Sequence, residues 1–134
     1  MDKSISIQTV LAIFIGGGLG SVVRYFLSVI LPFSQITQFP VHTLVANVIG
    51  CLFIGILFAI FSSLLNISQE LKLFLTVGFC GGLTTFSTFT LEIVNLYSQN
   101  KFLSILYALL SLILGLGSLL FGLLIGGGIV KNDV

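Results

Sequence analysis

The sequence predicts an all-α integral membrane protein: one domain over residues 1–134, with four transmembrane helices and a break in the third. Hydrophobic residues make up 57% of the chain and charged residues only 7%, and the mean hydropathy is +1.24. A soluble domain of this size needs far more charge at its surface. The apolar runs lie near residues 5–31, 41–65, 71–96 and 102–130. Each run is long enough for a spanning helix, which needs about 20 residues.

The first predicted span carries small residues and an arginine on one helical face. Gly17, Gly20, Arg24 and Ser28 recur every three or four residues, which places them on the same side of a helix. Small residues let a second helix approach closely. We expect the arginine on that face to point into protein or water. Snorkelling to the lipid headgroups is the alternative that the sequence leaves open.

The second predicted span begins near His42, which we expect at the membrane interface. Asn47 lies about one turn further in. A membrane asparagine commonly bonds a neighbouring helix, but it can also line a pore, and its position alone does not separate these roles. Cys51 and Cys80 both fall within spans, where we expect them to act as small apolar side chains.

The third predicted span is interrupted by residues 78–90, whose sequence is GFCGGLTTFSTFT. Adjacent glycines weaken a helix by about 1 kcal/mol each, and hydroxyl side chains compete with backbone hydrogen bonds. Irregular backbone survives at membrane depth only where it is buried in protein or lines a wet cavity. The stretch is therefore a candidate ion site. Glu92 follows it, and we expect this carboxylate near the water interface, either solvated or coupled to protons.

The fourth predicted span has a stripe of small and polar residues. Their spacing places them on one helical face, a pattern typical of a close-packed helix interface. Buried hydroxyls need hydrogen-bond partners, so the tyrosine and first serine are less easily explained by packing alone. The stripe consists of Tyr107, Ser111, Gly115, Ser118, Gly122 and Gly126.

Charge gives further limits on function. The net charge of +1 provides no basic patch for nucleic acid, and the single histidine rules out a cluster of histidine metal ligands. In a four-span chain, three lysines lie on one side of the membrane, and Lys101 and Arg24 on the other. So small a bias sets orientation weakly, which makes an antiparallel dual-topology homodimer plausible. The three lysines are Lys3, Lys72 and Lys131.

Three segments together resemble the CrcB/Fluc fluoride channel family. They are GGGLGSVVR at residues 16–24, TLVANVIG at residues 43–50 and GFCGGLTTFSTF at residues 78–89. The resemblance implies a multi-pass protein of the cell membrane that exports cytoplasmic fluoride passively. It also implies an antiparallel homodimer with two pores and a structural sodium ion (Na⁺) at the dimer interface.

The resemblance also implies roles for individual residues. The backbone carbonyls of Gly81 and Thr84 match those that hold the sodium ion. Two further positions, Arg24 and Glu92, are expected to support the site structurally. The residues expected along the fluoride pathway are Asn47, Phe86, Phe89, Ser87 and Thr88, and, on a looser match, Tyr107 and Ser111.

These residue types suit an anion that holds its water tightly. A fluoride pore must offer replacement donors, and amides, hydroxyls and the positive edges of aromatic rings supply them. Phe86 and Phe89 lie three apart and share a helical face. Two alternatives remain: a four-span proton-coupled multidrug exporter, which requires a carboxylate deep in the membrane, and a non-transporting accessory subunit. An enzyme is not expected, because no nucleophile–base pair or paired acids are present.

Overall fold

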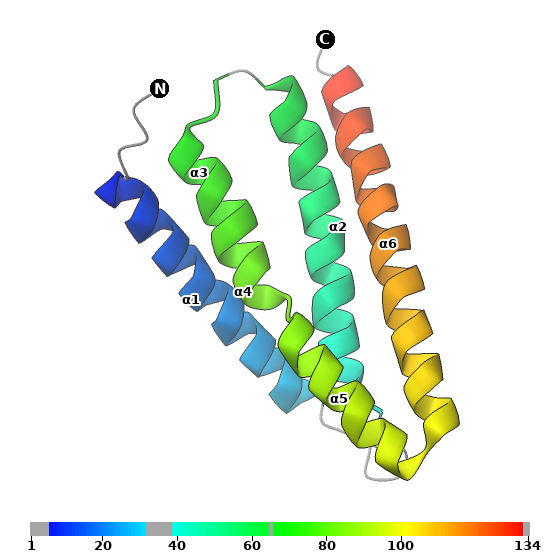
Figure 1. The fold of residues 1–134 in the computed structure, drawn as a ribbon. Helices are drawn as coiled ribbons and strands as arrows, with labels where there is room; N and C mark the ends of the chain where they lie inside the picture. The colour runs from blue at the N-terminus through cyan, green and yellow to red at the C-terminus, as the bar shows by residue number, and fades with distance from the viewer. Residues whose placement is uncertain (1–5, 32–38, 65, 133–134) are drawn as a thin grey trace.

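The computed structural model describes residues 6–31, 39–64 and 66–132, with side chains described up to residue 127. Four helices are long and apolar enough to cross a membrane, so the chain is a multi-pass membrane protein with the four spans that the sequence predicts. The third span is a succession of four short elements (Figure 1). The elements are α1 (Ile7–Ile30), α2 (Val41–Ser63), α3 (Gln69–Leu73), η1 (Phe74–Cys80), α4 (Gly81–Leu83), α5 (Phe86–Gln99) and α6 (Lys101–Asn132).

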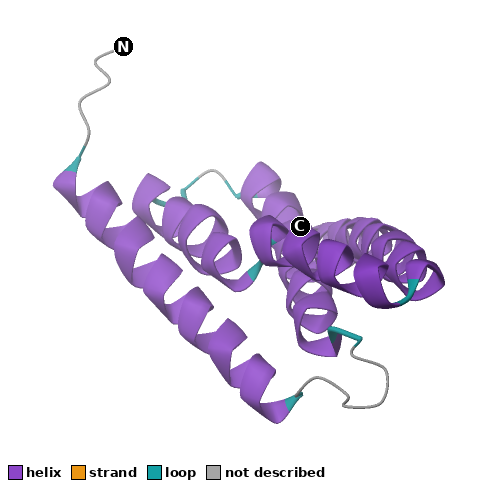
Figure 2. Cartoon of the chain, turned by 60° about the horizontal axis from the view of Figure 1, so that its bottom comes forward, coloured by secondary structure: helices purple, strands orange, loops and turns teal. Residues whose placement is uncertain are grey.

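The spans associate as two pairs. The first pair is α1 with η1 and α4, and the second is α2 with α6. In Figures 1 and 2, α1 lies on one side of the molecule beside the third span, and α6 lies on the other side beside α2. The two pairs run in opposite directions, so the start of α1, the α2–α3 connection and the end of α6 lie at one end of the molecule (Figure 1).

Glycines let both pairs pack backbone against backbone. Any Cβ added at Gly20 of α1 would collide with the carbonyl of Phe79, and one at Gly82 would collide with the carbonyl of Gly17. Between α2 and α6, an added Cβ at Gly55 or Gly122 would likewise meet the backbone of the other helix. The predicted interface faces of the first and fourth spans are therefore confirmed.

The break lies at the middle of the third span, inside the predicted stretch, but the glycines do not cause it. Gly81 and Gly82 themselves are helical, so the chain does not leave the helix at the glycines. The chain leaves helical geometry at Thr84 (ψ 154°) and Thr85 (φ −151°, ψ 121°). Gly82 packs closely against Gly17 of α1, and this backbone contact favours a helical conformation at that position. The seven residues before them, Phe74–Cys80, form a π-helix.

Candidate functional site

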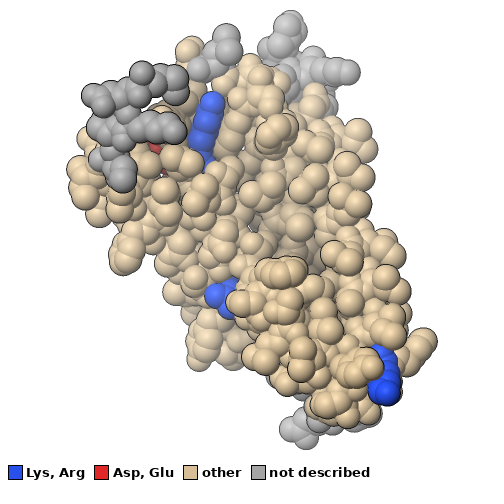
Figure 3. Space-filling model, in the orientation of Figure 1, with Lys and Arg blue, Asp and Glu red and all other residues tan. Residues whose placement is uncertain are grey.

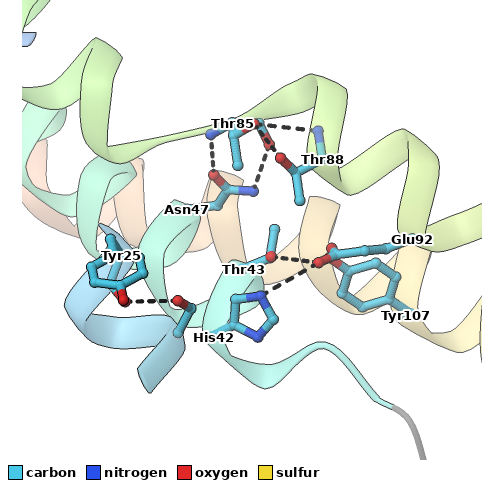
Figure 4. Close-up of polar contacts among 9 residues, drawn as sticks. Tyr25, His42, Thr43, Asn47, Thr85, Thr88, Glu92 and Tyr107 are labelled. Carbon is cyan, nitrogen blue, oxygen red and sulfur yellow. Dashed lines mark hydrogen bonds and ion pairs between the residues drawn. The ribbon is translucent and has the colours of Figure 1, made fainter. Parts of the chain in front are cut away.

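The broken backbone is held by one side chain of α2. The Asn47 amide nitrogen donates to the Thr85 carbonyl at 3.2 Å, and the Asn47 amide oxygen accepts from the Thr85 N–H at 2.8 Å (Figure 4). Asn47 therefore replaces the helical partners that Thr85 lost at the break. A backbone group left unpaired at membrane depth costs several kcal/mol, so this pair of bonds stabilises the irregular segment.

Hydroxyl groups end one helix and begin the next. The Thr84 hydroxyl donates to the Cys80 carbonyl at 2.9 Å, which caps the carbonyl end of α4. The Thr85 hydroxyl accepts from the Thr88 N–H at 3.3 Å and donates to the Thr88 hydroxyl at 3.1 Å. Thr85 is thus the N-cap of α5. The competition between hydroxyls and backbone that the sequence predicts is confirmed at these positions.

Arg24 lies against the carbonyl end of the same break. Its Nε donates to the Gly82 carbonyl at 3.2 Å, and the residue is only partly exposed. A positive charge beside the last carbonyls of a helix is favourable, since those groups carry partial negative charge. The expectation that Arg24 points into protein is confirmed, and the snorkelling alternative is not what the structure shows.

The carbonyls of Gly81 and Thr84 lie at the same break. Gly82 accepts from Arg24, Cys80 accepts from Thr84, and Thr85 accepts from Asn47. Within the described part of the chain, none of the hydrogen bonds at the break reaches the carbonyl of Gly81 or of Thr84. Two neighbouring oxygen dipoles without donors fit a hard cation.

A groove of about 460 Å³ opens beside the break, between the third span and the helix pair α2–α6. Its walls are mostly apolar, with a few polar groups from the asparagine, the break threonines and a serine of α6. Four residues predicted for the pathway line it: Asn47, Phe86, Phe89 and Ser111. The other lining residues are Gly50, Cys51, Ile54, Thr84, Thr85, Leu112, Gly115, Leu116 and Leu119.

Two phenylalanines follow the groove into the protein. The ring centroids of Phe86 and Phe89 are 5.8 Å apart, so the shared helical face is confirmed. Phe86 is 74% exposed in the single chain, whereas Phe89 is 8% exposed and packs on the Tyr107 ring at 5.4 Å. The Tyr107 ring in turn meets Phe39 edge-on at 5.3 Å. An aromatic row therefore runs from the open groove to a buried end.

Three residues predicted for the pathway do not line the groove. Ser87 is exposed, and Thr88 is bonded to Thr85 within the cap of α5. Tyr107 is fully buried at the inner end of the aromatic row. By contrast, Ser111 lines the groove, and its buried hydroxyl has no hydrogen-bond partner among the described residues.

Glu92 is buried, with 6% of its surface exposed, so the expectation of a solvated interfacial carboxylate is wrong. One carboxylate oxygen accepts from the Thr43 hydroxyl at 2.7 Å, and the other accepts from the Tyr107 hydroxyl at 2.7 Å (Figure 4). Glu92 lies in the middle of α5, well before the loop that follows this helix. Thr43 of α2 and Tyr107 of α6 cover its carboxylate. These two hydroxyls offset the cost of burying a charged group.

His42, in the first turn of α2, joins the same cluster and is buried against other helices. It is 9% exposed, and its Nε2 lies 3.6 Å from a Glu92 carboxylate oxygen (Figure 4). Our interpretation of the sequence assigned no role to Thr43. The spacing carried a signal for both helices: Thr43 lies four residues before Asn47, and Glu92 three after Phe89, so each shares a face with a groove residue.

Few charges interrupt the surface. Figure 3 shows a face composed almost entirely of uncharged residues, with basic side chains in separate places. Lys72 lies in the last turn of α3 and Lys101 is the first residue of α6, and the two helix ends lie at opposite ends of the molecule, as the four-span arrangement predicts. The described residues include no group of three or more His, Cys, Asp or Glu side chains placed to hold a metal. Both cysteines are free thiols, as expected.

The chain is similar to proteins of a single family. Residues 11–123 match the family model described as CrcB-like protein, Camphor Resistance (CrcB). The chain is 52% identical over 97 residues to the fluoride-specific ion channel FluC of Escherichia coli K12, covering 72% of this chain and 75% of that protein. It is 48% identical over 94 residues to the fluoride-specific ion channel FluC 1 of Yersinia pseudotuberculosis, covering 70% and 73%. It is also 50% identical over 97 residues to FluC of Shigella boydii.

Proposed function

This chain belongs to the CrcB family, and we infer from that membership and from its groove that it is a fluoride-specific ion channel. It is a channel and not an enzyme, and it lets fluoride leave the cytoplasm down its gradient through the cell membrane. The observation that carries the proposal is the convergence of Asn47, Phe86, Phe89 and Ser111 on one groove beside a broken helix.

The groove offers an anion several weak contacts and no full positive charge. The Asn47 amide nitrogen has a second hydrogen besides the one bonded to Thr85, and the Ser111 hydroxyl lines the same groove. The ring edges of Phe86 and Phe89 carry partial positive charge. Conduction requires sites that replace hydration but release the ion again, and weak donors in series meet that need.

The functional unit is a homodimer of antiparallel copies. Three features of the single chain support it: the groove is open, Phe86 is 74% exposed at its edge, and Gly81 at the break is exposed. A second copy covering this face would close the groove into a pathway. The weak bias of basic residues agrees with insertion in both orientations.

A sodium ion at the dimer interface would be held by the carbonyls of Gly81 and Thr84 from each copy. The support is that these two oxygens have no donor at the break, while the carbonyls around them are already bonded. When bound, the ion supplies positive charge at mid-membrane and satisfies the freed carbonyls. The residues of this chain contribute the geometry: Arg24 and Asn47 fix the backbone on either side of the pair.

A proton-coupled exporter is less well supported. The burial of Glu92 provides the deep carboxylate that such a mechanism needs. However, both of its oxygens accept hydroxyl hydrogen bonds, and it does not line the groove. An accessory subunit would have no use for the donors gathered at the break.

The test is fluoride release from liposomes containing the purified protein. Vesicles loaded with potassium fluoride are diluted into fluoride-free buffer, and release is followed with a fluoride electrode after addition of valinomycin. We expect rapid release that depends on valinomycin, because a passive anion flux must be balanced by potassium. Matched vesicles loaded with potassium chloride should release little, and protein-free vesicles none. Equal rates for fluoride and chloride, or release only with a proton gradient, would contradict the proposal.

A further inference from the structure

We propose that His42 is a positioning residue that makes fluoride conduction depend on pH through Glu92. The inference rests on the proposed function, and it concerns a contact that the pathway itself does not use. The Nε2 of His42 lies 3.6 Å from the Glu92 carboxylate oxygen that also accepts from Thr43. Both side chains are largely buried, so solvent screens their interaction little.

Glu92 lies directly behind the inner end of the groove. It bonds the Tyr107 hydroxyl at 2.7 Å, and the Tyr107 ring packs on Phe89, which lines the groove. The negative charge of the carboxylate therefore opposes an anion that reaches Phe89. The two hydroxyl hydrogen bonds spread this charge but leave it in place.

Protonation of His42 changes that field. An imidazolium ion beside Glu92 forms a salt bridge, and the pair together carries no net charge toward the groove. Salt-bridge formation also draws the carboxylate toward Nε2 and loosens its hold on the Thr43 and Tyr107 hydroxyls. Both effects lower the barrier for fluoride, so we expect conduction to rise as the pH falls.

Of the side chains in this cluster, we expect His42 to be the one that changes charge with pH. Among the titratable or charged side chains of the elements packed against α2, Glu92 of α5 and Tyr107 of α6 belong to the His42 cluster. Tyr97 and Lys101 are exposed and contact each other. The remaining described groups on these elements are Arg24 and Tyr25 of α1 and Cys80 of η1. The segment 32–38, outside the described residues, contains no titratable side chain in its sequence. Histidine is the side chain that ordinarily changes charge between about pH 5 and pH 8. Among the described residues, Glu92 is the carboxylate that lies beside the His42 ring.

The experiment measures the valinomycin-dependent fluoride flux at equal pH on both sides, from about pH 8 to about pH 5.5, the range in which histidine changes charge. Only this component counts, because HF crosses lipid uncharged and needs no potassium. In the unmodified protein the flux should rise severalfold toward low pH. His42→Gln should give a low flux that does not change with pH. His42→Lys, which carries its charge throughout, should give a high flux that does not change with pH.

Two matched variants complete the design. Glu92→Gln should remove the pH dependence whatever its absolute rate, because no carboxylate remains for His42 to neutralise. Gln99→His adds a histidine at an exposed position at the end of α5 and should keep the unmodified profile. A flux that falls toward low pH, or a His42→Gln variant with the same rise as the unmodified protein, would overturn the inference.

A second measurement does not rely on transport. Because His42 is the only histidine, ¹⁵N-histidine labelling reports on a single imidazole by NMR in detergent. We expect Glu92→Gln to move the His42 ¹⁵N resonances, because it removes the carboxylate that lies 3.6 Å from Nε2. Unchanged resonances would refute the pairing even if a variant failed to conduct. If the unmodified protein is folded but conducts no fluoride at any pH, the proposed function fails. A flux that ignores pH refutes the role of His42 alone.

Discussion

Asn47 and Thr85 form a closed pair of hydrogen bonds, in which the side-chain amide of one residue occupies both backbone groups of the other. This pair connects α2 to the mid-membrane break, and the same asparagine lines the groove. The two roles that the sequence left open for Asn47 therefore coincide. One side chain therefore both holds the break and lines the groove.

We expect Asn47→Asp to abolish fluoride flux. The change replaces the amide nitrogen, which donates to the Thr85 carbonyl, with a second acceptor oxygen at the same place. Two facing acceptors repel, and an added negative charge in the groove opposes an anion. Fluoride release from proteoliposomes measures the effect. Asn95→Asp, at an exposed position on α5, is the matched control and should conduct normally. Near-normal flux in Asn47→Asp would mean that the asparagine serves packing alone.

Gly81→Val should weaken the dimer without disturbing the single chain. A Cβ at Gly81 would meet only the Thr76 carbonyl at 3.9 Å, an ordinary contact, so any loss arises from the partner copy or the cation. Thr84→Ser should be nearly silent, since the serine keeps a hydroxyl for the Cys80 carbonyl and the cation would use only the backbone oxygen.

Crosslinking in detergent, in sodium and in N-methylglucamine buffers, measures this dimer prediction. We expect the unmodified dimer to weaken when sodium is withdrawn and Gly81→Val to be weak in both buffers. A dimer insensitive to sodium would argue against the carbonyl site. So would a well-resolved structure in sodium with no cation between the two copies of Gly81 and Thr84.

Phe86→Leu should reduce fluoride flux by removing a ring edge from the groove while keeping an apolar side chain of similar size. Phe102→Leu is a close control, because Phe102 is 75% exposed and Phe86 is 74% exposed in the single chain. Initial rates from the fluoride electrode compare the two. If both variants lose flux equally, or neither does, the ring edge of Phe86 does not contribute to the pathway.

Gly122→Ala should destabilise the α2–α6 pair, because the added methyl group would collide with the Leu52 carbonyl. Overpacking of this kind typically costs about 1–3 kcal/mol. Gly117→Ala is the control: no atom lies within 4 Å of a Cβ added there. Alanine also favours the helix by about 1 kcal/mol over glycine, so Gly117→Ala should melt at the same or a higher temperature. Thermal unfolding in detergent compares the two, and equal melting points would exclude close packing at Gly122.

Reporter fusions at the C-terminus should label both sides of the membrane, since the count of basic residues is three against two. Added lysines that strengthen the bias should select one orientation and reduce fluoride flux when that variant is expressed alone. Co-expression with a variant of the opposite bias should restore it. A single orientation in the unmodified chain would contradict the antiparallel dimer.

Local patterns in the sequence were sufficient for much of this fold. Apolar run lengths predicted the four spans, and the spacing of small residues predicted which faces of the first and fourth helices pack closely. These properties follow from hydrophobicity and helical period, which neighbouring residues along the chain determine. The break was also evident from residues 78–90, because hydroxyl groups that compete with the backbone are visible in the sequence itself.

The exact position of the break required the tertiary structure. Adjacent glycines weaken an isolated helix, yet Gly81 and Gly82 stay helical, with Gly82 packed against Gly17 of α1, and the chain opens at Thr84 and Thr85. Asn47, which belongs to the second span, stabilises the opened backbone by accepting a hydrogen bond from the Thr85 N–H. A contact between residues far apart in sequence outweighs a local preference of about 1 kcal/mol.

The burial of Glu92 also depends on the tertiary structure. Its place near the end of a span predicted a solvated carboxylate, but Thr43 from α2 and Tyr107 from α6 enclose it, and His42 lies beside it. The sequence by itself determined that this chain crosses a membrane four times and breaks its third span, and it predicted which residues would line a fluoride pathway. The structure decided which of them share the groove and which are buried behind it, because burial and hydrogen bonding depend on how separate helices meet.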